Sequence, residues 1–311
     1  MIDVIIEQVN AKEVFKRGEL KIMVSIITNL SVGYDIVKVK EPRDTIAEIE
    51  NVVAPEIIGY SAKDIEVIDT ILSELNLSSS ITMPISVSVA RAASNALDMP
   101  LFKFIGGSFI SDLPTVACDI LKDKENNSLF PIISAESIEE IVEFYLRIRE
   151  ELKNNYILAY DSYLCDNIFN EISKVSEIIN KIKEDEDLEI LLGLKAEKDK
   201  IEGKNLENID FLETNEPLDF DGFLCTEGFY EESDFIKVNP YELGTISELS
   251  YYINYINEKE LSPIISGENS SISHIAAGFK VPIVRTSIMS NILNELWNIE
   301  RNIANPSITR F

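Results

Sequence analysis

Apolar residues recur along the chain in two different rhythms, and the rhythm changes near residue 113. Before that point, residues 20–27 alternate as strands do, and we expect an antiparallel strand pair or meander within residues 2–27. Three stretches with helical spacing follow, at residues 44–53, 62–75 and 84–96. Strands followed by helices predict a small α+β domain over residues 1–112.

Beyond residue 113 the chain carries short apolar runs, each ending near a polar or charged residue. They lie at residues 115–120, 156–159, 189–194, 209–212, 222–225, 235–238, 262–265 and 282–284. Amphipathic helical patterns separate some of them, at residues 137–153, 167–183, 246–257 and 290–303. Such runs are typical of buried parallel strands, so the fold class is α/β.

About eight such runs predict a (β/α) barrel of the TIM type over residues 113–311. That range holds only 199 residues and shows little helical pattern between residues 193 and 238. Because such barrels typically need about 250 residues, we expect a barrel with shortened or missing outer helices.

Charge and composition narrow the class of partner. The chain has 311 residues with 28 Lys plus Arg and 54 Asp plus Glu, a formal net charge of −26. Phosphate backbones and anionic lipids attract clustered cations, so we expect no nucleic-acid partner and no membrane partner. No uncharged apolar stretch reaches about 18 residues, and residues 1–4 (MIDV) lack the basic and apolar regions of a signal peptide. Three cysteines without CxxC spacing suit reduced thiols, so we predict a cytoplasmic protein.

Several phrases of the sequence, in colinear order, resemble those of enolases. They are residues 54–59 (APEIIG), 87–107 with its small-residue helix pattern and PLFKFIGG ending, 236–240 (IKVNP), 243–248 (LGTISE) and 266–268 (SGE). The resemblance covers most of the chain and implies an enolase-like N-terminal domain followed by an enolase-like barrel. By resemblance alone, it also implies a homodimer.

The resemblance implies a chemistry as well. Enolases remove a proton next to a carboxylate and expel hydroxide, and Mg²⁺ together with a lysine stabilises the dianionic intermediate. Lys237 falls on the position of the general base and Arg285 on that of a second active-site lysine. Asp161 falls on the general-acid phrase, with a shorter reach than glutamate. A structural ion pair of Lys237 with Glu213 or Glu227 is the alternative interpretation.

The metal ligands are where the resemblance weakens. Glu213 and Glu227 match the second and third carboxylate ligands across large deletions, whereas Lys195 stands where the first carboxylate is expected. An ammonium group there repels a divalent cation and fills its space, so we do not expect Mg²⁺ to bind as it does in enolases. The pair that would hold the substrate carboxylate falls on Ile264 and Ile265.

Two hypotheses remain open. In the first, the chain is a divergent enolase-like protein without efficient phosphopyruvate hydratase activity, and it acts as a binding or regulatory homologue. Its partners would be a small phosphorylated carboxylate, a genuine enolase or a second copy of itself. In the second, it is an active lyase of the enolase superfamily that uses Lys237 as general base and a rewired site of Glu213, Glu227, Asp161 and Arg285.

Overall fold

The chain forms two compact units in the computed structural model, which describes residues 3–16, 18–159, 161–186 and 188–310. One unit comprises Met1–Ile110 and Asn239–Tyr255, and the other comprises Ser111–Val238 and Ile256–Phe311. Met1 and Ile2, which the prediction about a leader segment includes, lie outside the described residues. Within those residues no helix combines the length and the apolar character needed to cross a bilayer.

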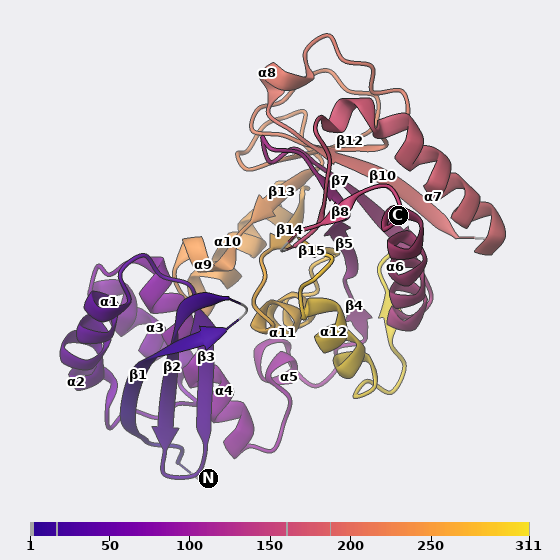
Figure 1. The fold of residues 1–311 in the computed structure, drawn as a ribbon. Helices are drawn as coiled ribbons and strands as arrows, with labels where there is room; N and C mark the ends of the chain where they lie inside the picture. Colours follow the sequence, from indigo (N-terminus) through magenta and orange to yellow (C-terminus); the bar gives the residue numbers. More distant parts are fainter. Residues whose placement is uncertain (1–2, 17, 160, 187, 311) are drawn as a thin grey trace. The chain divides into compact units, whose positions relative to one another are not determined.

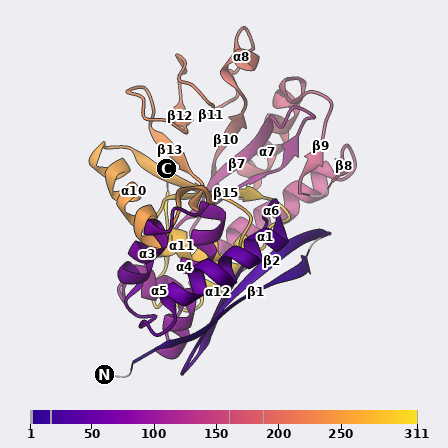
Figure 2. The ribbon, with the colours of Figure 1, turned by 90° about the vertical axis from the view of Figure 1, so that its left-hand side faces the viewer.

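The first unit begins with an antiparallel sheet, as predicted. Its strands β1 (Ile6–Lys16), β2 (Glu19–Thr28) and β3 (Val32–Val37) pair in chain order. Alternate residues of β2 are buried, beginning with Ile22, so one face of the sheet covers a core. The long β1 and β2 strands form a twisted ribbon against which helices of the same unit pack (Figure 2).

Helices follow the sheet and close its apolar face. They are α1 (Pro42–Glu48), a π-helical turn (Ile49–Val53), α2 (Ala54–Ile57), α3 (Ile65–Glu74), α4 (Ser79–Ala96) and α5 (Leu101–Gly106). Helix α4 begins five residues before the predicted start at Pro84, because Ser78 caps it by accepting a hydrogen bond from the Ser80 N–H. At Gly33 of β3 an added Cβ would lie 2.1 Å from the Ser88 carbonyl oxygen, so only glycine fits where β3 crosses α4.

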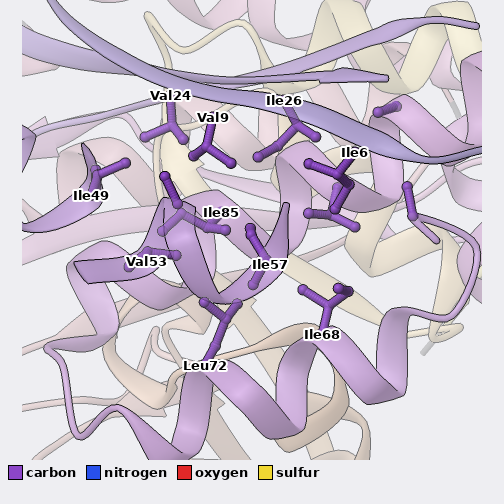
Figure 3. Packing of buried hydrophobic residues seen from close by; sticks show 14 of the residues in the cluster. Ile6, Val9, Val24, Ile26, Ile49, Val53, Ile57, Ile68, Leu72 and Ile85 are labelled. Carbon is purple, nitrogen blue, oxygen red and sulfur yellow. The ribbon is translucent and has the colours of Figure 1, made fainter. Parts of the chain in front are cut away.

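The core of the first unit is built from aliphatic side chains of the sheet and the helices (Figure 3). Figure 3 labels ten of them: Ile6, Val9, Val24, Ile26, Ile49, Val53, Ile57, Ile68, Leu72 and Ile85. The segment Asn239–Tyr255, with α9 (Pro240–Leu243) and the start of α10 (Ile246–Glu258), completes this unit. There Asp69 Oδ2 accepts hydrogen bonds from the N–H and the hydroxyl of Ser247, at 2.9 and 2.7 Å.

The second unit is a mixed α/β structure around a large curled sheet of eleven strands (Figure 1). Its strands are β5 (Thr115–Asp119), β6 (Leu121–Lys122), β7 (Ser128–Ser134), β8 (Ile157–Leu158), β9 (Tyr163–Leu164), β10 (Glu189–Lys195), β11 (Phe211–Glu213), β12 (Phe223–Thr226), β13 (Phe235–Val238), β14 (Ser262–Ser266) and β15 (Ile283–Ser287). The order across the sheet is β5-β15-β14-β13-β12-β11-β10-β7-β6-β9-β8. All eight predicted apolar runs therefore coincide with strands. The run at residues 156–159 was expected to be a buried parallel strand, but it forms the exposed strand β8, which pairs with β9 in the antiparallel sense.

The strands from β10 to β15 pair with one another in parallel, and β5 adds to β15 in parallel. Strand β7 was missing from the prediction, and it pairs with β10 in the antiparallel sense. The sheet curls until β7 approaches β5, since Thr115 Oγ1 donates a hydrogen bond to the Ile133 carbonyl at 2.7 Å. The Ile120 N–H likewise donates to the Leu129 carbonyl at 3.0 Å.

Helices border this sheet unevenly. They are α6 (Ile138–Leu152), a 3₁₀ turn (Ile168–Asn170), α7 (Ile172–Glu186), α8 (Lys198–Ile201), α11 (Ser271–Gly278) and α12 (Ile292–Glu300). A short pair of strands, β4 (Asp112–Leu113) and β16 (Ser307–Ile308), adjoins them. Between residues 193 and 238 the described residues contain only the four-residue helix α8, which agrees with the expected shortage of outer helices.

The inner face of the curl holds a compact apolar cluster. Its buried members come from seven strands and are Ala117, Phe130, Ile132, Phe211, Cys225, Phe235, Ile264 and Ile283. The rings of Phe211 and Phe235 are 5.2 Å apart between centroids, and Phe130 meets Phe211 edge-on at 5.9 Å. The charged residues of the candidate site lie next to this cluster, on the same face of the sheet.

Candidate functional site

A layer of charged side chains lies directly above the apolar cluster, at the carboxyl ends of the parallel strands. Residues two positions apart on a strand share a face, so each charged residue follows an apolar residue of the same inner face. The pairs are Ala117 with Asp119, Phe211 with Glu213, Cys225 with Glu227, Phe235 with Lys237, and Ile283 with Arg285. The carboxyl ends of such strands are where ligands bind in α/β folds.

Arg285 is the centre of this layer and is almost fully buried. Its Nε lies 2.9 Å from Glu213 Oε2, and its Nη2 lies 2.7 Å from Asp119 Oδ1. Its Nη1 donates to the Ala117 carbonyl at 2.8 Å. The guanidinium carbon stands 3.5 Å from the centroid of the Phe130 ring. The guanidinium of Arg285 thus donates hydrogen bonds from its edge and stacks on the Phe130 ring with its face.

The seat under Arg285 depends on a glycine in the neighbouring strand. The ring of Phe130 fills the space beside Gly193, where an added Cβ would lie 2.2 Å from Phe130 Cε2. Gly193 pairs with Phe130 in the antiparallel register of β10 and β7. A side chain at position 193 would therefore displace the ring that carries the guanidinium.

Lys237 and Lys122 extend the layer on either side of Arg285. Lys237 Nζ lies 2.8 Å from Glu213 Oε1 and 3.4 Å from Glu227 Oε1. Lys122 Nζ lies 3.2 Å from Asp119 Oδ2 and 2.7 Å from Asp161 Oδ2. The result is a continuous row of alternating charges, which we call the ion row: Asp161, Lys122, Asp119, Arg285, Glu213, Lys237 and Glu227.

The central carboxylates of the row stay ionised in spite of their burial. Burial raises the pKa of Glu213, but Arg285, Lys237 and Lys195 outweigh it and bring the pKa to about 2. Burial likewise raises the pKa of Asp119, and Arg285 and Lys122 bring it to about 2. Both carboxylates therefore carry full charge across the physiological pH range.

The same pairing keeps Lys237 protonated. Burial lowers its pKa, but Glu213 outweighs burial and raises the pKa above the ordinary value for lysine. A general base must release its proton near the working pH. As arranged here, Lys237 is a paired cation, and its environment does not prepare it to accept a proton.

Lys195 differs from the other cations of the layer. It ends β10 between Ser128 of β7 and Glu213 of β11 in the strand register. No described residue is within ion-pair or hydrogen-bond distance of its ammonium group. Burial lowers the pKa of Lys195, and the nearby charges of Lys237 and Arg285 lower it further against the opposing effect of Glu213.

The donor set does not suit a divalent cation. Both oxygens of Glu213 are engaged, one by Arg285 and the other by Lys237. Lys195 adds a third positive charge near this carboxylate. Mg²⁺ needs oxygen ligands at about 2.0–2.1 Å in octahedral geometry. Among the described residues, no group of three or more acidic, cysteine or histidine side chains has the arrangement of a metal site.

The structure brings together every site residue that the sequence singled out. Lys237, Arg285, Asp161, Glu213 and Glu227 all belong to the ion row, although Asp161 is joined only through Lys122. Their predicted roles in catalysis or metal binding stay predictions. Ile264 and Ile265 are buried strand residues, and their aliphatic side chains have no polar group that could bind a substrate carboxylate.

Sequence reasoning missed Asp119 and Lys122 as site residues. The available signal was the position of Asp119 at the end of the apolar run 115–120, the same position that Lys237 holds in its own strand. Ser128 was missed because β7 was missed, and its hydroxyl donates to Asp119 Oδ1 at 2.7 Å. Glu268 was also missed in this role, and it accepts hydrogen bonds from the N–H and the hydroxyl of Ser287 at 2.8 and 2.9 Å.

The chain is similar to known proteins at two levels of sequence identity. The chain is 55% identical to the uncharacterized protein MJ0198 of Methanocaldococcus jannaschii over 314 positions, which cover 100% of both chains. It is 22% identical to an enolase of Methanothermobacter thermautotrophicus over 350 positions, which cover 84% of each chain. An enolase of Campylobacter jejuni is 28% identical over 160 positions, covering 44% of this chain and 39% of the enolase.

No family model matches the chain. The distant matches agree with the enolase-like order of motifs, and they show an enolase-like relationship at the level of sequence. The close match extends from end to end, which the enolase matches do not. The chain therefore belongs to the same family as the uncharacterized protein MJ0198 of Methanocaldococcus jannaschii.

Proposed function

We propose that this protein is an enolase-like homologue without efficient phosphopyruvate hydratase activity, and that it acts by binding a small phosphorylated carboxylate or by regulating a partner. The observation that carries the proposal is the occupation of Glu213. This carboxylate accepts Arg285 on one oxygen and Lys237 on the other, at 2.9 and 2.8 Å. Because of these contacts, Glu213 is not available as a metal ligand and Lys237 is not available as a general base.

The loss of both groups acts on the same step of the reaction. Removing a proton next to a carboxylate creates a dianion, which needs concentrated positive charge and a neutral base beside it. Arg285 and Lys237 are cations, but their charge is already neutralised by Glu213 and Asp119. We accordingly propose that Mg²⁺ does not bind here as it does in enolases.

We also propose that the curled sheet contains an enolase-like barrel of eight strands. The candidates are β5, β7 and β10 to β15. The hydrogen bonds between the β5 and β7 regions support closure of the sheet into a barrel. Because β7 runs antiparallel to β10, this barrel would differ from one in which all eight strands are parallel. An experimental structure in which β5 and β7 lie too far apart to pair would contradict it.

An active lyase of the enolase type is the second candidate. It is favoured by one observation, the convergence of Glu213 and Glu227 on Lys237 at the carboxyl end of β13. In that function a substrate would displace the carboxylates from Lys237 and so lower its pKa to that of a base. Asp161, which faces solvent beside Lys122, would then supply the proton for the leaving hydroxide.

One assay separates the two functions. The purified protein is incubated with 2-phosphoglycerate and Mg²⁺, and formation of phosphoenolpyruvate is followed for the natural sequence and for Lys237→Ala. We expect no turnover above the level of Lys237→Ala. Turnover that Lys237→Ala abolishes would establish the lyase and refute the first proposal.

Ligand and partner binding are measured separately from turnover. Stabilisation by phosphoenolpyruvate in a thermal unfolding experiment would support a retained ligand, because a ligand that binds only the folded state raises the unfolding temperature. Light scattering on the protein alone and on its mixture with a genuine enolase tests the proposed homodimer and the proposed mixed complex. If the protein is a monomer and does not bind the enolase, both the homodimer and the mixed complex are excluded.

A further inference from the structure

The charged layer contains four cations, and three of them already have carboxylate partners. Lys122, Lys237 and Arg285 each contact two carboxylates of the ion row. Lys195 contacts none among the described residues. An ammonium group offers three N–H donors, so Lys195 has all of its donors available.

The position of Lys195 keeps it on the side that a ligand can reach. It follows Gly193 on the inner face of β10, and the Phe130 ring beside Gly193 closes the layer from below. On the opposite side the side chain of Glu227 is 71% exposed and that of Asp161 is 38% exposed, and Lys195 itself is half-buried. A small solute can therefore approach the layer from the carboxyl ends of the strands.

The charge around Lys195 is incompletely compensated. Burial, Lys237 and Arg285 together lower its pKa, against the opposing effects of Glu213 and Asp119. These two carboxylates are already held by other cations. An anion placed at Lys195 would supply the missing partner and relieve its repulsion with Lys237.

We propose that Lys195 is the binding group for the carboxylate of a small organic acid. The inference deepens the proposed binding function and rests on it. The four cations of the layer balance the four carboxylates of the ion row, so these eight groups together are neutral, and Glu268 beside them is engaged by Ser287. A neutral layer with one available ammonium favours a ligand group with a single charge, which is a carboxylate and not a phosphate dianion. Lys237, whose two carboxylate contacts leave one N–H, is the second donor.

The first experiment measures anion-dependent stability of the full chain. Thermal unfolding is followed in sodium acetate, sodium pyruvate or sodium phosphate, each against sodium chloride at the same ionic strength. We expect acetate and pyruvate to raise the unfolding temperature by about 2–4 °C near tenfold excess over the dissociation constant. Lys195→Met should lose this rise, whereas Lys195→Arg should keep it.

Lys198→Met is the matched control. Lys198 lies three residues further along, outside the strand, and its closest acidic partner is Glu216 at 3.9 Å. Its replacement should leave the anion effect unchanged. A rise that survives in Lys195→Met, or a rise with phosphate but not with the carboxylates, would overturn the proposal.

A second measurement uses only the natural protein and so does not depend on a variant that folds. Lysine side chains are acylated with a small reagent, and the extent at each residue is read by peptide mass spectrometry with and without pyruvate. Pyruvate should slow labelling of Lys195 at least threefold and leave Lys198 unchanged. Equal labelling of Lys195 in both conditions would refute the inference, whereas turnover of 2-phosphoglycerate would refute the proposed function instead.

Discussion

The interiors of the two units achieve burial by different means. The core of the first unit consists of aliphatic side chains, among them Ile26 and Leu72, which are fully buried. The inner face of the curled sheet changes within two residues of several strands from apolar side chains to charged ones, of which Glu213 and Arg285 are buried. Apolar packing tolerates partial loss, whereas a buried ion leaves its partner uncompensated when it is removed. The two interiors should therefore respond differently to mutation and to pH.

The largest effect is expected from removing the central cation. Arg285→Met leaves Glu213 and Asp119 buried with fewer partners, and it should lower the free energy of unfolding by about 3–5 kcal/mol. Urea unfolding followed by circular dichroism measures the change. Arg310→Met, which removes an exposed contact with Glu136, is the comparison and should cost less than about 1 kcal/mol. Equal effects of the two variants would contradict a cooperative ion row.

Truncation in the aliphatic core should be nearly as costly but different in character. Leu72→Ala removes a fully buried side chain and should cost about 2–5 kcal/mol through lost burial and the cavity that remains. Because no buried charge contributes to this loss, the same difference should be measured at pH 7 and at pH 4. A loss that shrinks in acid would show that this core does not act independently of charge.

Acid should act on the ion row in a defined direction. The pKa values of Glu213 and Asp119 are depressed to about 2, so the stability that they contribute is present above their unfolded-state pKa values and is lost as the pH falls. The difference in unfolding free energy between the natural protein and Arg285→Met should therefore shrink by roughly 2 kcal/mol between about pH 5 and pH 3. Taking this difference cancels the effect of the overall charge, and a constant difference would count against the assigned pKa shifts.

The smallest effect concerns the metal. Lys195→Asp replaces the unpaired ammonium by a carboxylate beside Glu213, and Mg²⁺ at a few times its dissociation constant should then stabilise the variant by about 1 kcal/mol. The natural sequence should show no such effect. The comparison is made by thermal unfolding with and without Mg²⁺, with Lys198→Asp as control. Stabilisation of the natural sequence by Mg²⁺ would show that Glu213 can leave its cation partners.

Much of the architecture follows from short-range patterns. The apolar runs locate β5 and β10 to β15, because a strand buried on both faces must be apolar over its length. Strand β7 (Ser128–Ser134) escapes this reasoning because Pro131 lies inside it. Proline is tolerated only at strand positions that need no N–H donor, and the pattern of residues 128–134 does not reveal whether that condition holds.

The sequence predicted the members of the site and the ion pair of Lys237 with Glu213 or Glu227, but not the contacts of Arg285 with Glu213 and Asp119. Lys237, Glu213 and Arg285 end or interrupt apolar runs, so their place at one edge of the sheet follows from the strands. The curl of the sheet determines which charges meet, and it depends on long-range contacts such as that between Thr115 and Ile133. That is why Asp119 was missed, although its contact with Arg285 at 2.7 Å is among the shortest in the row.

Gly193 has a consequence that reaches beyond its own strand. Gly193 has no side chain, so the Phe130 ring can occupy the space beside it. The position of this ring in turn determines the position of the Arg285 guanidinium that stacks on it. A single methyl group at this position would thus act as a mechanical wedge, tilting the ion on which Asp119 and Glu213 converge. The position of Arg285, which contacts two carboxylates and an aromatic ring, therefore depends on residue 193 being glycine.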